Sequence, residues 1–214
     1  MTIMIRTLSL VCAFVTLAFI GSSACAQNET PTGSPDEIVR GAAQAALDAM
    51  EGRREFLEAN PAELRTIVDA VFRPRFDTNY AAYLVLGRYG RSADSEQKRR
   101  FTAALYNYIL SRYAQGLLRF ESDRLQILRY QGDPDAERAT VRTAVTLDDG
   151  TKVPVNYDLR LGSEGWRVYD ISIEGISYVR NLRSQLGAEI EQTGLDAVIL
   201  RLEAYRAPDQ AEAA

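Results

Sequence analysis

The amino-acid sequence predicts an α+β fold in which several helices cover the apolar face of a twisted antiparallel sheet of about four strands. Up to Phe120 the apolar residues recur at helical spacing, and from Leu125 to Ile173 they alternate with polar residues at a period of two. Helical spacing returns after Gly175, so a last strand is expected to run almost directly into a helix. Such a joint sets the angle between sheet and helices, and we expect that angle to leave an apolar cavity between the two layers.

The N-terminal residues 1–26 have the pattern of a secretory signal peptide. Arg6 supplies the positive end, an apolar run extends from Leu8 to Ile20, and Ala24-Cys25-Ala26 forms an A-x-A cleavage site. Acylation of Cys25, as in a lipoprotein, is the less favoured alternative because Ser22-Ser23-Ala24 is a poor lipobox. A periplasmic location is therefore expected.

The remaining chain is expected to form one domain. Residues 27–34 are polar and are predicted to be a flexible lead-in. The folded domain is predicted to span residues 35–206, and residues 207–214 are predicted to be a disordered tail.

The composition excludes several classes of protein. The chain has no histidine, and its two cysteines, Cys12 and Cys25, both lie in the predicted signal peptide. A mature chain would lack a thiol nucleophile, an imidazole base and the usual ligands of zinc, copper and haem, so no metal or cofactor is expected. The formal net charge of −4 argues against a nucleic-acid partner, which would require a basic face.

The helical part of the sequence has clear start signals. Ser34 with Pro35 and Glu37 predicts the start of a first helix, and Asn60-Pro61 predicts a second, which Pro74 interrupts. A third helix is expected from Phe76 to about Leu86, and a fourth, long and aromatic on one side, after Asp94.

The sheet is predicted to be a meander. Leu125 and Ile127 start a strand, and a second strand ends at the hairpin signal Asp148-Asp149-Gly150-Thr151. The return strand leads through Gly162-Ser163-Glu164-Gly165 to the strand that begins at Trp166. Two helical segments, after Gly175 and after Gly194, close the chain.

Three charged motifs have both a functional and a structural interpretation. Asp133-Pro134-Asp135 resembles part of a calcium loop but lacks its glycine and distal glutamate, so a turn is favoured. Lys98-Arg99-Arg100 is interpreted as a solvent face, with a docking patch for an acidic partner or lipid phosphate as the alternative. Asp158, Asp170 and Glu174 could serve acid/base chemistry, but no nucleophile accompanies them. We expect Asp170 and Glu174 to accept hydrogen bonds around Gly175.

Several blocks of residues carry a resemblance to a known family. The blocks are Asn60-Pro61 with Leu64, Ile67, Val68 and Pro74; Leu86-Gly87 with Arg88, Arg91, Ala93, Glu96-Gln97 and Phe101; Tyr113 with Leu117; and Val168, Asp170, Ile173, Glu174, Gly175, Ile176, Ser177, Val179, Asn181, Arg183, Gly194 and Asp196. In this order they resemble the MlaC, or toluene-tolerance, family. Gly90 departs from the pattern, which has an aromatic residue there.

The resemblance implies a soluble, non-enzymatic periplasmic carrier with an NTF2-like, cone-shaped layout and with phospholipid as its cargo. It also implies shuttling between an outer-membrane lipoprotein and porin complex and an inner-membrane ABC transporter with an MCE-domain subunit, which maintains outer-membrane lipid asymmetry. A monomer is expected. Two other functions remain open, namely a protein-binding adaptor without cargo and a lipid hydrolase on the same scaffold.

The lipid-binding residues are predicted from periodicity, by combining the apolar face of the sheet with the apolar stripes of the helices. The sheet is expected to contribute Val145, Leu147, Val155, Tyr157, Leu159, Val168, Ile171 and Ile173. The helices are expected to contribute Val68, Phe72, Tyr83, Leu84, Phe101, Leu105, Tyr108, Ile109, Ile176 and Val179.

Overall fold

A computed structural model describes residues 33–205, apart from 120–123 and 134. The predicted signal peptide, most of the lead-in and the C-terminal tail lie outside these residues. The α-helices are α1 Pro35–Met50, α2 Arg54–Ala59, α3 Pro61–Phe72, α4 Thr78–Leu86, α5 Ser95–Tyr113, α6 Tyr178–Thr193 and α7 Leu195–Ala204. Three short 3-10 helices are η1 Arg73–Arg75, η2 Gly87–Arg91 and η3 Ala114–Arg119. The strands are β1 Leu125–Ile127, β2 Arg138–Thr146, β3 Lys152–Gly162, β4 Gly165–Ile173 and β5 Ile176–Ser177.

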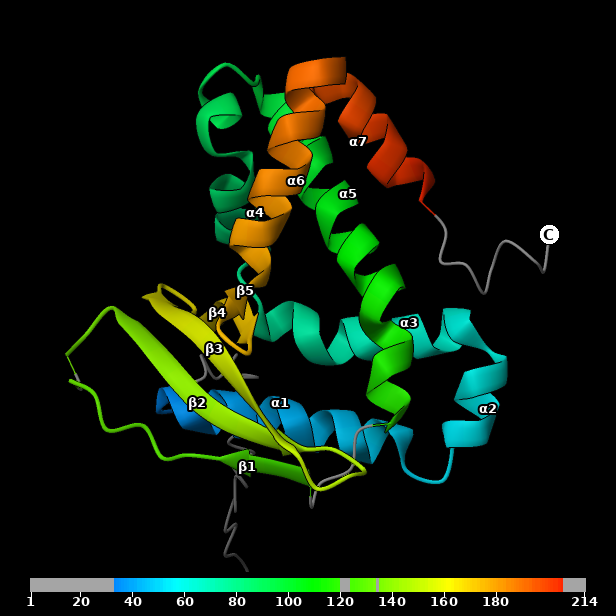
Figure 1. Cartoon of the computed structure of the whole chain (residues 1–214), viewed down its shortest axis with the longest axis vertical. Helices are drawn as coiled ribbons and strands as arrows, with labels where there is room; N and C mark the ends of the chain where they lie inside the picture. The colour runs from blue at the N-terminus through cyan, green and yellow to red at the C-terminus, as the bar shows by residue number, and fades with distance from the viewer. Residues whose placement is uncertain (1–32, 120–123, 134, 206–214) are drawn as a thin grey trace, which may run out of the picture.

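The predicted α+β architecture is confirmed, with one more strand than expected. The five strands form a single antiparallel meander in the order β1-β2-β3-β4-β5. Figure 1 shows α4, α5, α6 and α7 gathered beyond one end of the sheet, while α1 lies across it and α3 packs against α1. Among the described residues no helix is both long and apolar enough to cross a bilayer.

The helix starts agree with the cap signals in the sequence. The backbone amide of Ser34 donates to Glu37 at 2.7 Å at the start of α1. Asp94 accepts from the amide of Gln97 at 2.7 Å, and the Gln97 side chain accepts from the Asp94 amide at 3.1 Å. The third helix, however, begins at Thr78 rather than at Phe76, because the Asp77 side chain accepts from the Tyr80 amide and caps it.

The joint at Gly175 differs from the prediction. Glu174 and Gly175 both have positive φ, at 50° and 79°, and form a two-residue turn that sends the chain back along β4 as β5. The helix starts only after this short strand, at Tyr178. Ile176 therefore belongs to β5 rather than to the helical stripe, and the residue is 61% exposed.

A β-bulge decides which residues of β4 face the helices. Asp158 pairs with Asp170 but the next residue, Leu159, pairs with Val168, so Tyr169 is an extra residue in β4. Because side chains alternate along a strand, the extra residue places Val168 and Ile171 on the same face of the sheet. The apolar face of β4 is therefore formed by even-numbered residues before the bulge and by odd-numbered residues after it.

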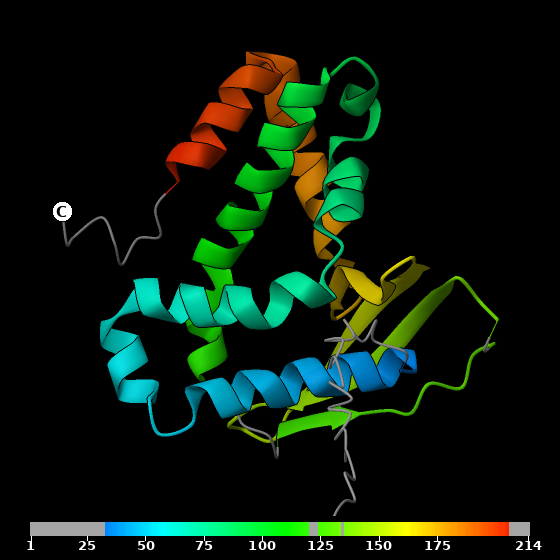
Figure 2. The same ribbon diagram turned by 180° about the vertical axis from the view of Figure 1, so that it is seen from behind.

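Three apolar clusters hold the layers together. One joins α4 to α5, α6 and α7 around Phe101 and Val198. A second joins Ile38 and Val39 of α1 to the sheet, and a third joins α1 to α3 and η3 around Leu64. In Figure 2, α1 lies in front of the sheet and α3 lies between α1 and the upper helices, so the second and third clusters border the region between helices and sheet.

Candidate functional site

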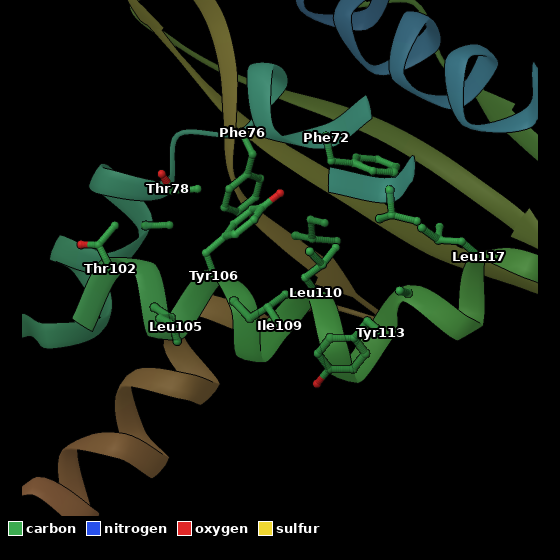
Figure 3. Close-up of a pocket in the computed structure, with 14 residues that line it drawn as sticks. Phe72, Phe76, Thr78, Thr102, Leu105, Tyr106, Ile109, Leu110, Tyr113 and Leu117 are labelled. Atoms are coloured by element: carbon green, nitrogen blue, oxygen red, sulfur yellow. The ribbon is translucent and has the colours of Figure 1, made fainter. Parts of the chain in front are cut away.

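The first cavity, which we call the α5 cavity, is an apolar space of about 210 Å³. Figure 3 shows α5 side chains along one wall, with Phe72 and Phe76 opposite. The lining residues are Val68, Phe72, Phe76, Thr78, Ala81, Thr102, Leu105, Tyr106, Ile109, Leu110, Tyr113, Ala114, Leu117 and Ile171. Since packed interiors contain few voids larger than one water molecule, of roughly 30 Å³, this space is not a packing defect.

The second cavity, which we call the α1 cavity, is a space of about 200 Å³ between α1 and the sheet. Its lining residues are Ile38, Val39, Ala42, Ala43, Ala46, Phe72, Arg75, Phe76, Leu117, Leu125, Val145, Tyr157, Val168 and Ile171. Four residues, Phe72, Phe76, Leu117 and Ile171, line both cavities and form the wall between them, which we call the shared wall. The two spaces therefore lie side by side and share a wall of apolar side chains.

Local sequence explains why these spaces stay open. On α5 the lining residues recur at intervals of three and four, so they form one face of the helix. On α1 the lining residues Ala42, Ala43 and Ala46 are small and fill little of the volume between helix and sheet. Neither lining includes a carboxylate, and Arg75 is the single cationic side chain among the lining residues that the structure describes.

Asp77 holds the segment that carries Phe76 against the sheet. The Asp77 amide donates to the Val168 carbonyl at 2.7 Å, and Phe76 forms a parallel bridge with Val168. The Asp77 carboxylate is buried, accepts from the Tyr80 amide at 3.0 Å, and accepts from Arg160 Nε at 2.7 Å. The position of one wall residue is thus fixed by a cap, an ion pair and a backbone hydrogen bond.

Comparison with known proteins identifies the family. The family described as "MlaC protein" matches residues 40–204, which is most of the chain. The chain belongs to the MlaC family. The predicted family resemblance is therefore confirmed.

Relatives of this MlaC-family chain share about a quarter of its residues. It is 24% identical over 173 residues to the intermembrane phospholipid transport system binding protein MlaC of Haemophilus influenzae, covering 79% of this chain and 81% of the relative. It is 25% identical over 165 residues to the toluene tolerance protein ttg2D of Pseudomonas putida, covering 76% of each. A phospholipid-binding protein from Ralstonia solanacearum, solved in complex with a phospholipid, has a TM-score of 0.71 and 22% identity, covering 79% of this chain and 99% of that one. That similarity establishes the shared fold.

The structure brings part of the predicted site together. The predicted residues that line one or both cavities are Val68, Phe72, Leu105, Ile109, Val145, Tyr157, Val168 and Ile171. The predicted residues that are instead buried among core side chains are Phe101, Val155, Leu159 and Val179. Those that are partly buried outside both linings are Leu84, Tyr108 and Ile173. Those that are exposed on the surface are Tyr83, Leu147 and Ile176.

The lining residues that the periodicity did not predict come mainly from α5 and α1. Helical spacing from Leu105 would have found Thr102, Tyr106, Leu110 and Tyr113, because these follow the same face of α5. Small residues such as Ala42, Ala43 and Ala46 are typical of a face for close helix packing, and only the structure shows that they border a space. Phe76 was assigned to a helix, and its role depends on a contact with β4.

The acidic residues considered for catalysis have structural partners. Asp170 is buried and accepts from the Val179 amide at 3.0 Å and from the Ser177 hydroxyl, so it stabilises the start of α6. Asp158 accepts from the Thr140 hydroxyl at 2.6 Å. Glu174 forms the turn with its backbone. Among the described residues, no group of three His, Cys, Asp or Glu side chains could hold a metal ion.

The basic run on α5 is engaged in surface ion pairs. Arg99 pairs with Glu96 at 2.6 Å, and Arg100 pairs with Glu203 of α7 at 2.7 Å. These contacts support the interpretation of this run as a solvent face.

Proposed function

We propose that this chain is a periplasmic phospholipid carrier that holds acyl chains in the α5 cavity and the α1 cavity. The observation that carries this proposal is the pair of adjacent apolar spaces, whose linings contain aliphatic and aromatic side chains and almost no charge. Two relatives are named for phospholipid transport and toluene tolerance, and a protein of the same fold was solved with a phospholipid bound.

The energetics explain why enclosed cavities are needed. Exposure of acyl chains to water costs about 0.8 kcal/mol per methylene, so two chains of about fifteen methylenes cost on the order of 24 kcal/mol. A carrier must cover nearly all of that apolar surface inside the protein, since a large exterior patch would promote association. The headgroup can remain in water, which would give the carrier broad tolerance of headgroups.

The shared wall supports the use of both cavities by one lipid molecule. Phe72, Phe76, Leu117 and Ile171 are all apolar, so nothing charged would have to be desolvated if they moved apart. We propose that each cavity takes one acyl chain and that the shared wall lies near the point where the two chains diverge. Glycines at the ends of elements, such as Gly87 and Gly175, are the proposed hinge positions for opening.

We further propose that the carrier moves lipid between an outer-membrane complex and an inner-membrane transporter without chemical change to the lipid. The linings offer no carboxylate and the chain has no histidine, so the described cavities lack an obvious acid/base pair. Incubation with phospholipid should yield no free fatty acid or lysolipid.

Native mass spectrometry of the protein purified from the periplasm tests the carrier function directly. We expect a mass increment equal to one phospholipid, and lipid extraction should identify the species. A protein that shows only its lipid-free mass, and that takes up no phospholipid from vesicles, would instead be an adaptor. Release of fatty acid would indicate a hydrolase.

A further inference from the structure

Tyr106 has a polar atom in a place where the surroundings are apolar. The residue lies on α5 and lines the α5 cavity, and Figure 3 shows its hydroxyl directed toward the gap between Phe76 and Phe72. The hydroxyl oxygen is buried and has no hydrogen-bond partner among the described residues. A buried hydroxyl without a partner costs roughly 1–3 kcal/mol, so the hydroxyl would gain from an acceptor supplied by a ligand.

The nearby charged groups meet this need only in part. Arg73 Nε donates to both Asp69 carboxylate oxygens at 3.0 Å, so the two side chains are hydrogen-bonded to each other. The Arg73 guanidinium lies 4.4 Å from the centroid of the Tyr106 ring and contacts its face. The Asp69 carboxylate lies near enough to act on the phenol as a hydrogen-bond acceptor and to raise its pKa. The contact does not reach the distance and angle of a normal hydrogen bond, so an acceptor with better geometry can compete for the hydroxyl.

We propose that the Tyr106 hydroxyl donates a hydrogen bond to an ester carbonyl of the bound phospholipid and so fixes the glycerol end of the two acyl chains at the shared wall. This inference rests on the proposed carrier function. It assigns a specific acceptor to a buried hydroxyl. Entry of the lipid would separate Phe72 from Phe76 and bring the carbonyl to the hydroxyl.

The chemistry of the site favours an ester carbonyl over the other lipid oxygens. Burial raises the pKa of Tyr106, and the nearby Asp69 carboxylate raises it further, so the phenol stays protonated and can donate at any physiological pH. A phosphate oxygen carries charge that would have to be desolvated among apolar side chains. The ester carbonyl is a neutral acceptor that sits where the two chains branch, as the shared wall sits where the two cavities meet.

The test compares lipids that differ only in the acceptor. Lipid-free protein is titrated with dioleoyl phosphatidylglycerol and with its dialkyl ether analogue, which has the same headgroup and chains of matched length but no carbonyl. The wild-type protein should bind the ester lipid about fivefold more tightly, the expected effect of one hydrogen bond of about 1 kcal/mol. Tyr106→Phe should bind both lipids with nearly equal affinity.

The matched control is Tyr108→Phe, on the same helix but outside both cavities, where the ring packs edge-on against Tyr205. It should keep the wild-type preference for the ester lipid. The free energy of unfolding of lipid-free Tyr106→Phe should equal or exceed that of the wild type, because the variant removes an unpartnered hydroxyl.

Equal ester-to-ether ratios in the wild type and Tyr106→Phe would overturn the proposal, since the hydroxyl would then be satisfied by water or by Asp69. Failure of the wild type to bind either lipid would instead overturn the carrier function. The two failures are therefore distinguishable.

Discussion

Arg160 of β3 donates to the carboxylate of Asp77 at 2.7 Å across 83 positions of the sequence. The Asp77 side chain is 5% exposed, whereas the Arg160 side chain is 37% exposed. The carboxylate is therefore buried, and the guanidinium reaches it from the surface. Arg167 approaches the same carboxylate at 3.9 Å. The pair connects the start of α4 to the sheet beside Phe76, and it therefore positions the shared wall.

Replacement of Asp77 should separate the two tasks of its carboxylate. Asp77→Ala removes the helix cap and the ion pair, and should lower the free energy of unfolding by about 3 kcal/mol. Asp77→Asn keeps a side chain that can cap α4 but removes the charge, so it should cost about 1–2 kcal/mol. Urea denaturation of both variants measures the difference. Equal stability of the two variants would show that the cap contributes nothing.

Filling the α5 cavity should reduce lipid carriage. Leu105→Trp adds volume to a residue that lines this cavity, so we expect at least a severalfold drop in co-purifying phospholipid. Leu147→Trp is the matched control, because Leu147 is 46% exposed and lies outside both cavities. Lipid content is measured by extraction and mass spectrometry. An unchanged lipid content in Leu105→Trp, with the fold intact, would remove the α5 cavity from the binding site.

Gly87 should be intolerant of a side chain. Its φ is +51°, and a Cβ there would lie 2.7 Å from Nε of Arg183. Gly87→Ala should lower the free energy of unfolding by about 1–2 kcal/mol. Gly41→Ala is the control, since Gly41 lies in α1 with no atom within 4 Å of the new methyl group, and it should stabilise the protein by about 0.5–1 kcal/mol. Thermal unfolding of the two variants should therefore shift in opposite directions.

High pH should weaken the fold through its buried phenols. Burial raises the pKa of Tyr157, which lines the α1 cavity, above the ordinary value of 10.0. Below about pH 10 the phenol is protonated in both folded and unfolded chains; above it the unfolded chain ionises first, so stability falls as pH rises. The fall is at most about 1.4 kcal/mol per pH unit for one tyrosine. The free energy of unfolding, measured by urea denaturation between about pH 9 and 11, should fall less in Tyr157→Phe than in the wild type. If the free energies of the two proteins fall in parallel over this range, Tyr157 is not the phenol responsible.

The local features of the fold could be predicted because they depend on neighbouring residues. The caps at Ser34 and Asp94 and the meander after Leu125 follow from short-range chemistry and from strand alternation. The turn at Glu174 was missed because a non-glycine residue with positive φ is uncommon and leaves no periodic signal. The bulge at Tyr169 likewise depends on pairing with β3.

The candidate site could be predicted only in part, for a different reason. Periodicity identifies which face of an element is apolar, but it does not tell whether that face meets another side chain or an empty space. Phe101 and Leu105 lie on the same stripe of α5 and in the same buried cluster, yet only Leu105 lines the α5 cavity. The cavities arise from the combined shapes of α1, α3, α5 and β4, which no single segment encodes. The contact between Asp77 and Arg160 is likewise long-range and has no local signature.

The lengths of the outer strands have a consequence for behaviour at high concentration. The sheet ends in β1 and β5, of three and two residues, and the segment at Phe76 and Asp77 hydrogen-bonds to the outer side of β4. Such truncated borders offer little backbone for a second molecule to extend, which is how many β-proteins avoid fibril growth. Among the described residues, the chain can therefore line its interior with apolar side chains while offering neighbouring copies little strand edge to join.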